Sequence, residues 1–397
     1  MSQDEVIKLY CHSLANRLKP DQDFLSNTIS SLNNKLLLDS SIGNTPVLSP
    51  LSILYAMLIV YFGASGETKN QMKKILNLNL SDNQLITNLC SYTKRQTRNT
   101  QNDRTQSDQT QSDPTQSVKL VNSNALLIGP NIVIEKSYEN KIKGLFGADI
   151  VFFKTPADAV LKANSWVSLK TNNLINKLLT IRDTTGAKMI ILNTIYFKAT
   201  WMNQFKSTDT YSGKFKSLSG DKNRLFMTHR NSYDYYENDN MQCIDLPYTD
   251  NRYSMRFIMP RQAQAIDTLL QNSKMVFNIP LKNTLVDLFL PKFEHRQKIT
   301  LQKSFRNMGM TDLFLANKAD LSLISKDGLY VGKIIHEAVV KVDEKGTEAA
   351  AVTAVTMLST AMMNPIKPVE LVLDHFFYYA IIDKSNKEYL FNGFFDG

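Results

Sequence analysis

Residues 344–354 constrain the fold most, because they combine a charged start, one glycine and a run of small side chains, EKGTEAAAVTA. In an extended strand, alternate side chains share a face. Glu348, the only charge after Gly346, falls on one face, and the other carries only small residues: Thr347, Ala349, Ala351 and Thr353. Such a segment can enter a sheet between two strands without burying an unpaired charge, which would cost several kcal/mol.

Gly346 suits a hinge, because glycine tolerates backbone angles that other residues resist. The same composition also fits an alanine-rich helix or a plain loop. Alanine favours helix, whereas threonine and valine favour strand, so the segment alone leaves these alternatives open.

Short motifs along the chain favour the strand interpretation. Each is weak alone, but they follow one another in a fixed order: Ser49–Ile53, Gly63–Thr68, Gln71–Met72, Asn164–Val167, Asn193–Trp201, Leu246–Tyr248, Leu290–Phe293, Met308–Phe314 and His336–Ala338. In this order and spacing they resemble the serpins, the serine protease inhibitor superfamily, and in particular its intracellular, ovalbumin-like type without a signal peptide. The C-terminal motif Asp374–Phe377 departs from the family, with Phe376 where the family usually has proline.

The resemblance implies an α+β fold of about nine helices packed on three β-sheets, with an exposed reactive loop. It implies one domain over residues 1–397, with the reactive loop at 344–368. Residues 99–117 repeat a five-residue polar unit without apolar side chains. Such a repeat cannot offset its ordering entropy, so we expect a disordered surface loop there.

Hydrophobic periodicity predicts helices first and strands later, which is typical of an α+β fold. The predicted helices are 5–18, 24–38, 50–62, 84–98, 158–178, 262–272 and 299–308. The predicted strands are 124–128, 189–198, 225–237, 241–248, 253–259, 284–294, 329–343 and 376–393.

Composition excludes several classes of protein. Cys11, Cys90 and Cys243 are too few and too scattered for a disulfide framework, and no metal-ligand spacing occurs. The sequence shows neither a signal peptide nor an apolar membrane span. The net charge of +9 is diffuse, and no nucleic-acid motif accompanies it. We expect a monomer that is cytoplasmic or exported without a cleaved signal peptide, so extracellular action stays open.

No sequence pattern indicates an enzyme, since no His-Glu-x-x-His or Gly-x-Ser-x-Gly motif is present. The resemblance instead implies two structural clusters. One lies under the centre of the main sheet and controls its opening: Ser49, Ser52, Asn193 and His336. The other lies where the loop enters the sheet: Trp201, Lys292 and Glu344.

The resemblance implies inhibition as a suicide substrate, followed by insertion of the cut loop. Its hinge would comprise Glu344, Gly346, Thr347, Glu348, Ala349, Ala350, Ala351 and Thr353. Counting forward from Gly346 puts the reactive bond at Thr360–Ala361, whereas counting back from Asp374 favours Met362, Met363 or Lys367. Small and apolar residues before Lys367 predict an elastase-like or chymotrypsin-like target protease. The alternative is a non-inhibitory serpin acting as a carrier, chaperone or storage protein.

Four cations lie at the end of the predicted 84–98 helix and just beyond it: Lys94, Arg95, Arg98 and Arg104. Helical spacing places several of them on one exposed face. In heparin-activated serpins this helix carries the glycosaminoglycan site, so a sulfated glycosaminoglycan is a candidate partner, and no other cofactor is expected. The alternative is a solvated helix end without a ligand.

Overall fold

The computed structural model describes residue 11 and residues 19–39, 41–42, 45–107, 118–262, 273–347 and 367–397; the side chains of 96–107 and 273 are not described. This part of the chain contains eight α-helices: α2 (Phe24–Leu37), α3 (Pro50–Tyr61), α4 (Gly66–Ile75), α5 (Asp82–Ser107), α6 (Lys136–Phe146), α7 (Pro156–Lys170), α8 (Ile181–Thr184) and α10 (Gln302–Asn307). Three 3₁₀ turns accompany them: η2 (Ser207–Asp209), η3 (Ser273–Asn278) and η4 (Asp312–Phe314).

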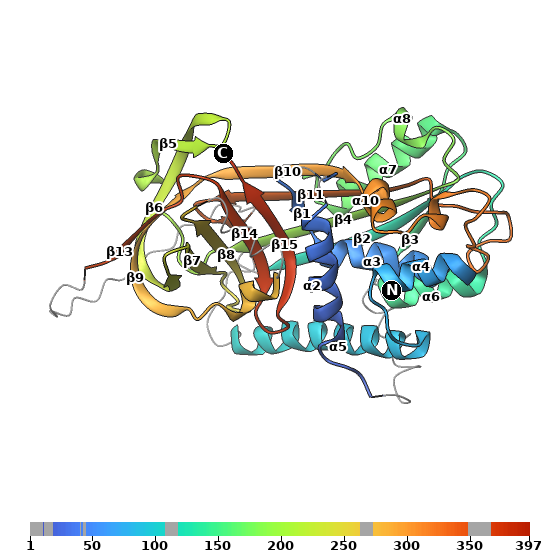
Figure 1. The fold of residues 1–397 in the computed structure, drawn as a ribbon, viewed down its shortest axis with the longest axis horizontal. Helices are drawn as coiled ribbons and strands as arrows, with labels where there is room; N and C mark the ends of the chain where they lie inside the picture. Colours follow the sequence, from blue (N-terminus) through green and yellow to red (C-terminus); the bar gives the residue numbers. More distant parts are fainter. Residues whose placement is uncertain are drawn as a thin grey trace.

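A six-stranded sheet forms the centre of the molecule (Figure 1). Its strands, in spatial order, are β10 (Phe293–Thr300), β11 (Lys333–Asp343), β12 (Gly346–Thr347), β4 (Met189–Thr200), β2 (Lys119–Ile128) and β3 (Asp149–Phe152). Figure 1 shows α7 and α8 on one side of the long strands β4, β10 and β11, and α2 to α6 on the other. The sheet is therefore covered on both faces.

The remaining strands are joined through one long strand, β6 (Gly220–Glu237). Its first part pairs with β5 (Tyr211–Ser217), its middle with β9 (Lys282–Pro291), which also carries β13 (Val369–Val372), and its end with β7 (Met241–Pro247). From β7 the ladder continues through β8 (Tyr253–Pro260), β14 (Phe377–Asp383), β15 (Glu388–Phe395) and β1 (Val47–Leu48). Because β6 changes partners, these nine strands form two groups that complete the three predicted sheets, and the α+β fold is confirmed.

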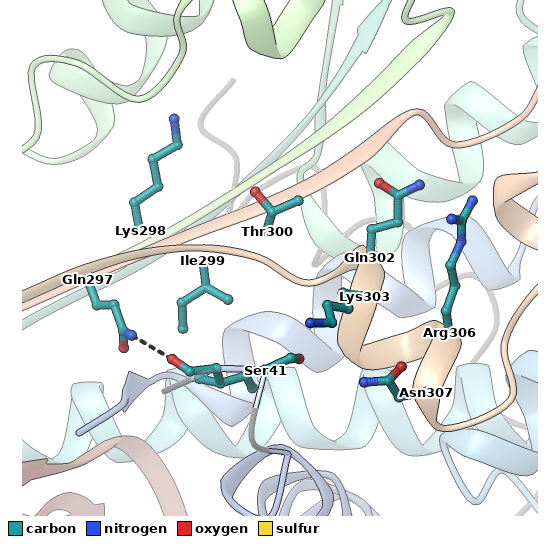
Figure 2. A pocket seen from close by; sticks show the side chains of 10 residues that line it. Ser41, Gln297, Lys298, Ile299, Thr300, Gln302, Lys303, Arg306 and Asn307 are labelled. Atoms are coloured by element: carbon teal, nitrogen blue, oxygen red, sulfur yellow. Dashed lines mark hydrogen bonds between the residues drawn. The ribbon is translucent and has the colours of Figure 1, made fainter. Parts of the chain in front are cut away.

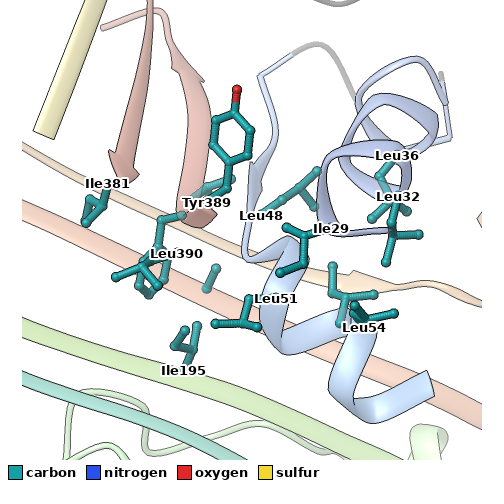
Figure 3. Packing of buried hydrophobic residues seen from close by; sticks show 14 of the residues in the cluster. Ile29, Leu32, Leu36, Leu48, Leu51, Leu54, Ile195, Ile381, Tyr389 and Leu390 are labelled. Carbon is teal, nitrogen blue, oxygen red and sulfur yellow. The ribbon is translucent and has the colours of Figure 1, made fainter. Parts of the chain in front are cut away.

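Helix α3 lies between the sheets and explains their close packing. Almost all its side chains are buried, as expected for a helix that is apolar on every side. Pro50 occupies its first turn, and the side chain of Ser49 caps its N-terminus. Figure 3 shows Leu51 and Leu54 of α3 among apolar side chains from α2, β1, β4, β14 and β15.

Two predicted helices differ from the structure at their ends. Helix α5 continues to Ser107, so the prediction of a disordered loop from residue 99 is wrong for its first part. Once a helix exists, each added residue gains a backbone hydrogen bond at little further cost, even in a polar repeat. The predicted helix at 158–178 ends at Lys170, because Asn172 and Asn173 adopt left-handed backbone angles.

Some predicted segments lie outside the described residues. Residue 11 is the one described position of the predicted helix at 5–18, and it is helical. Residues 108–117, and nearly all of the predicted helix at 262–272, cannot be compared.

Candidate functional site

The hinge begins as a short strand that already separates two strands of the central sheet. In β12, Thr347 pairs with Val342 of β11 on one side and with Ala199 of β4 on the other, both antiparallel. Gly346 pairs in the same way with Asp343 and Thr200. The start of the predicted reactive loop is therefore held between β4 and β11.

Space between these strands dictates the residue types of β12. A Cβ atom at Gly346 would overlap the carbonyl oxygen of Ala199, so glycine is required by close approach rather than by flexibility alone. Thr347 is 2% exposed, and its hydroxyl hydrogen-bonds with Tyr248 Oη at 2.6 Å. Only a small side chain fits at either position.

Trp201, Lys292 and Glu344 come together directly above β12. Lys292 Nζ lies 2.7 Å from Glu344 Oε2. The Trp201 indole N–H donates to the carbonyl of Asp343 (2.9 Å), and its backbone N–H donates to that of Lys345 (2.9 Å). The cluster thus holds the backbone on both sides of Glu344 through hydrogen bonds.

Two further residues that sequence reasoning missed complete this cluster. Tyr248 stacks on Trp201 with ring centroids 4.6 Å apart, and Thr210 donates a hydrogen bond to Glu344. Burial alone would raise the pKa of Glu344, but the hydrogen bonds from Lys292 and Thr210 outweigh it and hold the pKa below its ordinary value. Thr210 lies outside every motif, so no sequence signal pointed to it.

The boundary between β4 and β11, called the seam here, changes character along its length. The two strands pair directly, in parallel, from Lys333 and Ile190 to Glu337 and Thr194. Beyond Glu337 the described residues show no direct pairing between them, and β12 lies between them at Val342 and Ala199. The seam is therefore closed at one end and parted at the hinge end.

The four residues predicted under the centre of the sheet meet at the seam. Asn193 Nδ2 donates to Ser52, and Asn193 Oδ1 lies 2.7 Å from His336 Nδ1. The backbone N–H of Ser49 donates to His336 Nε2 at 3.2 Å. His336 therefore carries its proton on Nδ1 and donates it to Asn193, and burial lowers its pKa to about 3.

Asn122 and Asn124 of β2 extend this cluster. Ser52 Oγ donates to Asn122 Oδ1, and Asn193 Nδ2 donates to Asn124 Oδ1, each at 2.9 Å. Neither residue was predicted in the cluster: Asn124 begins the predicted strand at 124–128 and Asn122 precedes it, and only the pairing with β4 brings both to Asn193. Together these bonds join α3, β2, β4 and β11 at one point.

Most of the predicted loop lies outside the described residues. This applies to the hinge residues Glu348, Ala349, Ala350, Ala351 and Thr353, and to the reactive-bond candidates Thr360, Ala361, Met362 and Met363. Lys367 is described and exposed, two residues before β13 begins at Val369.

Of the four cations predicted on α5, Arg95 is half-buried. Its Nη2 donates to the carbonyl of Gln22 (3.3 Å) and its Nε is buried, so the side chain points into the molecule. Lys94 is exposed. Neighbouring side chains on a helix point about 100° apart, so Lys94 can face solvent while Arg95 does not. The side chains of Arg98 and Arg104 are not described, and the glycosaminoglycan site stays a prediction.

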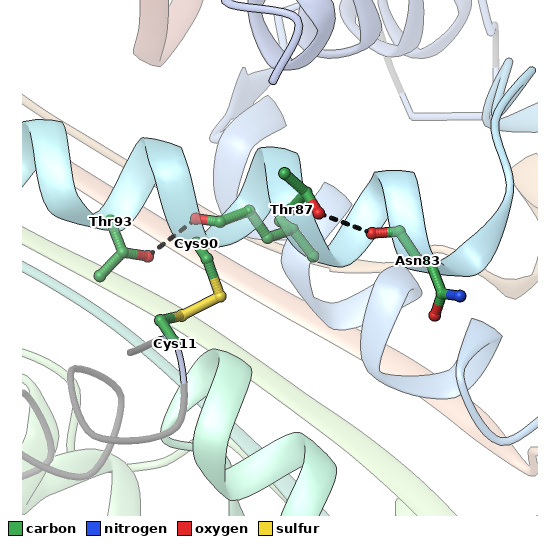
Figure 4. The surroundings of a disulfide bond; sticks show 6 residues. Cys11, Asn83, Thr87, Cys90 and Thr93 are labelled. Atoms are coloured by element: carbon green, nitrogen blue, oxygen red, sulfur yellow. Dashed lines mark hydrogen bonds between the residues drawn. A yellow bond between two sulfur atoms is a disulfide. The ribbon is translucent and has the colours of Figure 1, made fainter. Parts of the chain in front are cut away.

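One disulfide is present, which the expectation of no disulfide framework did not anticipate. Cys11 and Cys90, 79 residues apart, form a bond that links residue 11 to α5 (Figure 4). Cys243 is a free, buried thiol, and burial raises its pKa. The spacing of the cysteines could not reveal the pair, because the contact depends on how α5 packs.

A hollow of about 510 Å³ lies between Ser41 and Ile42 on one side and β10 and α10 on the other (Figure 2). Lys303 and Arg306 on its rim are exposed. Lys298 points to the opposite side of β10 from Gln297 and Ile299. The hollow lies at the end of β10 farthest from the hinge, since Thr300 pairs near the start of β11 and Phe293 near its end.

The described residues contain no group of three or more His, Cys, Asp or Glu side chains suited to a metal ion. No helix among them has the length and apolar character needed to cross a membrane.

The fold described above, with a hinge of small residues held between two strands of the central sheet, is typical of proteins in which an exposed loop can insert into that sheet as an additional strand. The family description "Serpin (serine protease inhibitor)" matches residues 29–396, and the chain belongs to this family. The predicted resemblance is confirmed.

Known relatives agree with this assignment. Human Serpin B4 is 30% identical over 392 residues, covering 93% of this chain and 99% of that protein. Leukocyte elastase inhibitor of Xenopus tropicalis is 29% identical over 367 residues, covering 87% of this chain and 91% of that protein. The native-state structure of tengpin, a thermophilic serpin, is 28% identical, has a TM-score of 0.80 and covers 98% of both chains.

Proposed function

We propose that the protein is a serine protease inhibitor that acts as a suicide substrate. The observation that carries this proposal is β12, which holds the first two hinge residues between β4 and β11 in the uncut chain. A strand can therefore grow along the seam from a start that is already in register. Most serpins inhibit proteases rather than catalyse reactions, which agrees with this proposal.

The register of β12 supports the choice of reactive bond. Continued along β11 and β4, it brings Thr353 between His336 and Asn193, and Met357 opposite Met189 at the start of β4. Residues 347–357 would then fill the seam. Thr360 would lie just past its end, in agreement with the forward count from Gly346.

The same register gives the polar cluster a role. In a sheet, strands lie about 4.8 Å apart, so an inserted strand doubles the separation of β4 and β11. The 2.7 Å hydrogen bond between His336 and Asn193 would then break, and Thr353 would supply a hydroxyl between them. The cluster opposes opening before cleavage and accepts the new strand afterwards.

The chemistry uses the protease's own mechanism. The serine Oγ attacks the carbonyl carbon of Thr360, the bond to the nitrogen of Ala361 breaks, and the serine proton passes to the leaving amine. An ester then joins the two proteins. Insertion of the loop displaces the attached protease and distorts its active site, which can then no longer activate water to hydrolyse the ester. Thr360 and the nearby methionines fit the shallow or apolar pockets of elastase-like and chymotrypsin-like proteases. The relative from Xenopus tropicalis that is named leukocyte elastase inhibitor supports this choice.

The Cys11–Cys90 disulfide supports action in an oxidising compartment, because disulfides seldom persist in the cytosol. We therefore place the protein's target outside the reducing part of the cell.

The test is incubation with neutrophil-type elastase, chymotrypsin and trypsin, followed by denaturing gels. We expect an SDS-stable complex with one of the first two, and mass spectrometry should locate the released peptide at Ala361. The control is the same protease with its serine blocked, which should give neither complex nor cleavage. Cleavage by all three without a complex would contradict inhibition and favour the carrier or storage alternative.

A further inference from the structure

The segment containing α7 and α8 crosses the outer face of the six-stranded sheet and is bonded at both ends. On the β3 side, the Trp166 indole N–H donates to Asp149 Oδ2 at 2.8 Å, and Lys170 Nζ lies 3.1 Å from the same oxygen. Apolar side chains of α7, including Val167, also pack on β2 and β4. This end of the segment therefore belongs with β2, β3 and β4.

The other end is bonded to β10 and β11, across the seam. Asp183 of α8 reaches both strands, with Oδ2 3.0 Å from Lys298 Nζ and Oδ1 3.0 Å from Lys333 Nζ. Arg296 Nη2 of β10 donates to the carbonyl of Leu174 at 2.8 Å. We call these contacts, together with residues 171–184, the ionic strap.

The position of Asp183 is built into α8. The carboxylate accepts hydrogen bonds from the backbone and hydroxyl of Thr180, which form a capping box. Its side chain is 15% exposed, and those of Lys298 and Lys333 are about one-third exposed or less. The pairs are therefore fixed in place and partly shielded from solvent.

On the outer face of the sheet, beneath the strap, the side chains at the end of the paired stretch do little to keep the seam closed. The last direct pair of β11 and β4 is Glu337 with Thr194, and Thr194 pairs in turn with Ser123 of β2. Glu337 Oε2, Thr194 Oγ1 and Ser123 Oγ are all buried, and none has a hydrogen-bond partner among the described residues. Buried polar atoms without partners gain from contact with water, so opening the seam relieves rather than costs these three groups.

Adding a strand at the seam moves β10 and β11 about 4.8 Å away from β4. Ion pairs of 3.0 Å cannot stretch that far, so one end of the segment must release. The β3 end is anchored by α7, which packs on both β2 and β4 and is bonded to Asp149. Beyond α7, the segment shares an apolar cluster with Ile335 and Val339 of β11, and Asp183 adds the ion pairs to β10 and β11. Release therefore falls on Asp183.

We propose that Asp183, through Lys298 and Lys333, sets how fast the cut loop inserts and hence how the acyl-enzyme divides between trapping and hydrolysis. This rests on the proposed inhibitory function. The three side chains are positioning residues, since none touches the scissile bond. Their charges delay insertion in the uncut and newly cut protein alike.

The test compares Asp183→Asn with wild type after cleavage of the loop by a metalloprotease, which forms no acyl-enzyme. Asparagine keeps an oxygen to cap α8 but removes the charge. Insertion is followed by pulsed hydrogen exchange of the β4 and β11 amides. We expect insertion about fivefold faster in Asp183→Asn, which corresponds to ~1 kcal/mol of lost ion pairing. Raised salt should accelerate wild type and leave the variant unchanged.

A matched control is Glu139→Gln. Glu139 also bridges two lysines, Lys136 at 2.9 Å and Lys143 at 2.5 Å, but all three lie on α6 away from the seam. Its insertion rate should equal that of wild type. The double variant Lys298→Met with Lys333→Met leaves Asp183 and its cap intact, and it should reproduce the acceleration if Asp183→Asn folds poorly.

The outcomes separate the two proposals. Insertion at the wild-type rate in both Asp183→Asn and the double variant would overturn the strap while leaving inhibition in place. A wild-type protein that never inserts its cut loop would overturn the proposed function, and the strap with it. With a trapped protease, Asp183→Asn should also need fewer molecules of inhibitor for each protease inactivated.

Discussion

Thr347 leaves no room for a larger side chain at the start of the hinge. It is buried between Val342 and Ala199, and its hydroxyl contacts Tyr248. In Thr347→Arg a charge would have to enter the sheet ahead of the strand, so we expect the protein to become a substrate that is cut without trapping. The yield of SDS-stable complex measures this. Thr347→Ser is the control and should keep its yield, whereas an undiminished yield in Thr347→Arg would contradict the role of the hinge.

His336 predicts a pH dependence of known sign. Its pKa is about 3 in the folded protein and 6.5 when exposed, so the folded state favours the neutral ring. The stability that this ring contributes is complete above pH 6.5 and is lost as the pH falls toward 3, by at most about 1.4 kcal/mol per pH unit. Protonation of Nε2 would also direct an N–H at the backbone N–H of Ser49, which now donates to that atom.

The measurement is the rate at which the uncut protein converts to an inserted form at fixed temperature, between pH 7.5 and 5. Wild type should convert faster as the pH falls. His336→Gln can keep one donor and one acceptor but does not titrate, so its rate should depend less on pH. Equal pH slopes in the two proteins would mean that other groups control the seam.

At the scale of elements, periodicity located most helices and strands, but their ends depended on tertiary contacts. Helix α3 matched closely because every side of it is apolar and Ser49 and Pro50 mark its start. The end of α7 depended on two left-handed asparagines that periodicity does not register. Strand β5 and helix α6 were missed, because their polar sequences resemble surface loops until packing gives them a buried side.

The two side-chain clusters were also predicted only in part. Residues within motifs, such as Trp201 and His336, were predicted and do lie together. Asn122, Asn124 and Thr210 were missed, because only the register of the sheet brings them to the site. The bond from Arg95 to Gln22 was not foreseen, since a helix pattern alone cannot tell which cation turns toward a neighbouring segment.

The disulfide between Cys11 and α5 is a second feature at the scale of elements. Cys11→Ser removes a bond that closes a long loop, and we expect a loss of about 2–4 kcal/mol in stability. The thermal midpoint with and without reductant measures it. Reductant should lower the midpoint of wild type to that of Cys11→Ser and leave the variant unchanged; the same response in both would place the effect elsewhere.

For the whole molecule, cleavage of the loop should raise resistance to heat. If residues 347–357 fill the seam, about ten hydrogen bonds of roughly 1 kcal/mol net each would stabilise the cut form by about 10 kcal/mol. The thermal midpoint before and after cleavage near Thr360 is the measurement. An unchanged or lower midpoint would show that the loop stays outside the sheet, and the inhibitory proposal would fail.

The pairing register of the sheet also determines which charged side chains would lie beside an inserted strand. Lys198 pairs with Lys119 on β2, and Lys341 pairs with Glu294 on β10. Continued by one residue beyond Thr347, the register would place Glu348 between Lys341 of β11 and Lys198 of β4, on the outer face of the sheet. Two cations would then lie on either side of one carboxylate.

Insertion would therefore relieve repulsion between like charges, and the cut form should be stabilised less at high ionic strength than at low. Lys341→Glu would set two carboxylates side by side in the cut form and should reduce the gain in thermal midpoint on cleavage. Residue 341 also pairs with Glu294, so the variant should lower the midpoint of the uncut protein too, and the gain is taken relative to the uncut variant. Combining it with Glu348→Lys should restore the gain. If Lys341→Glu alone gives the full wild-type gain, the carboxylate at 348 does not meet these lysines, and the strand enters in another register.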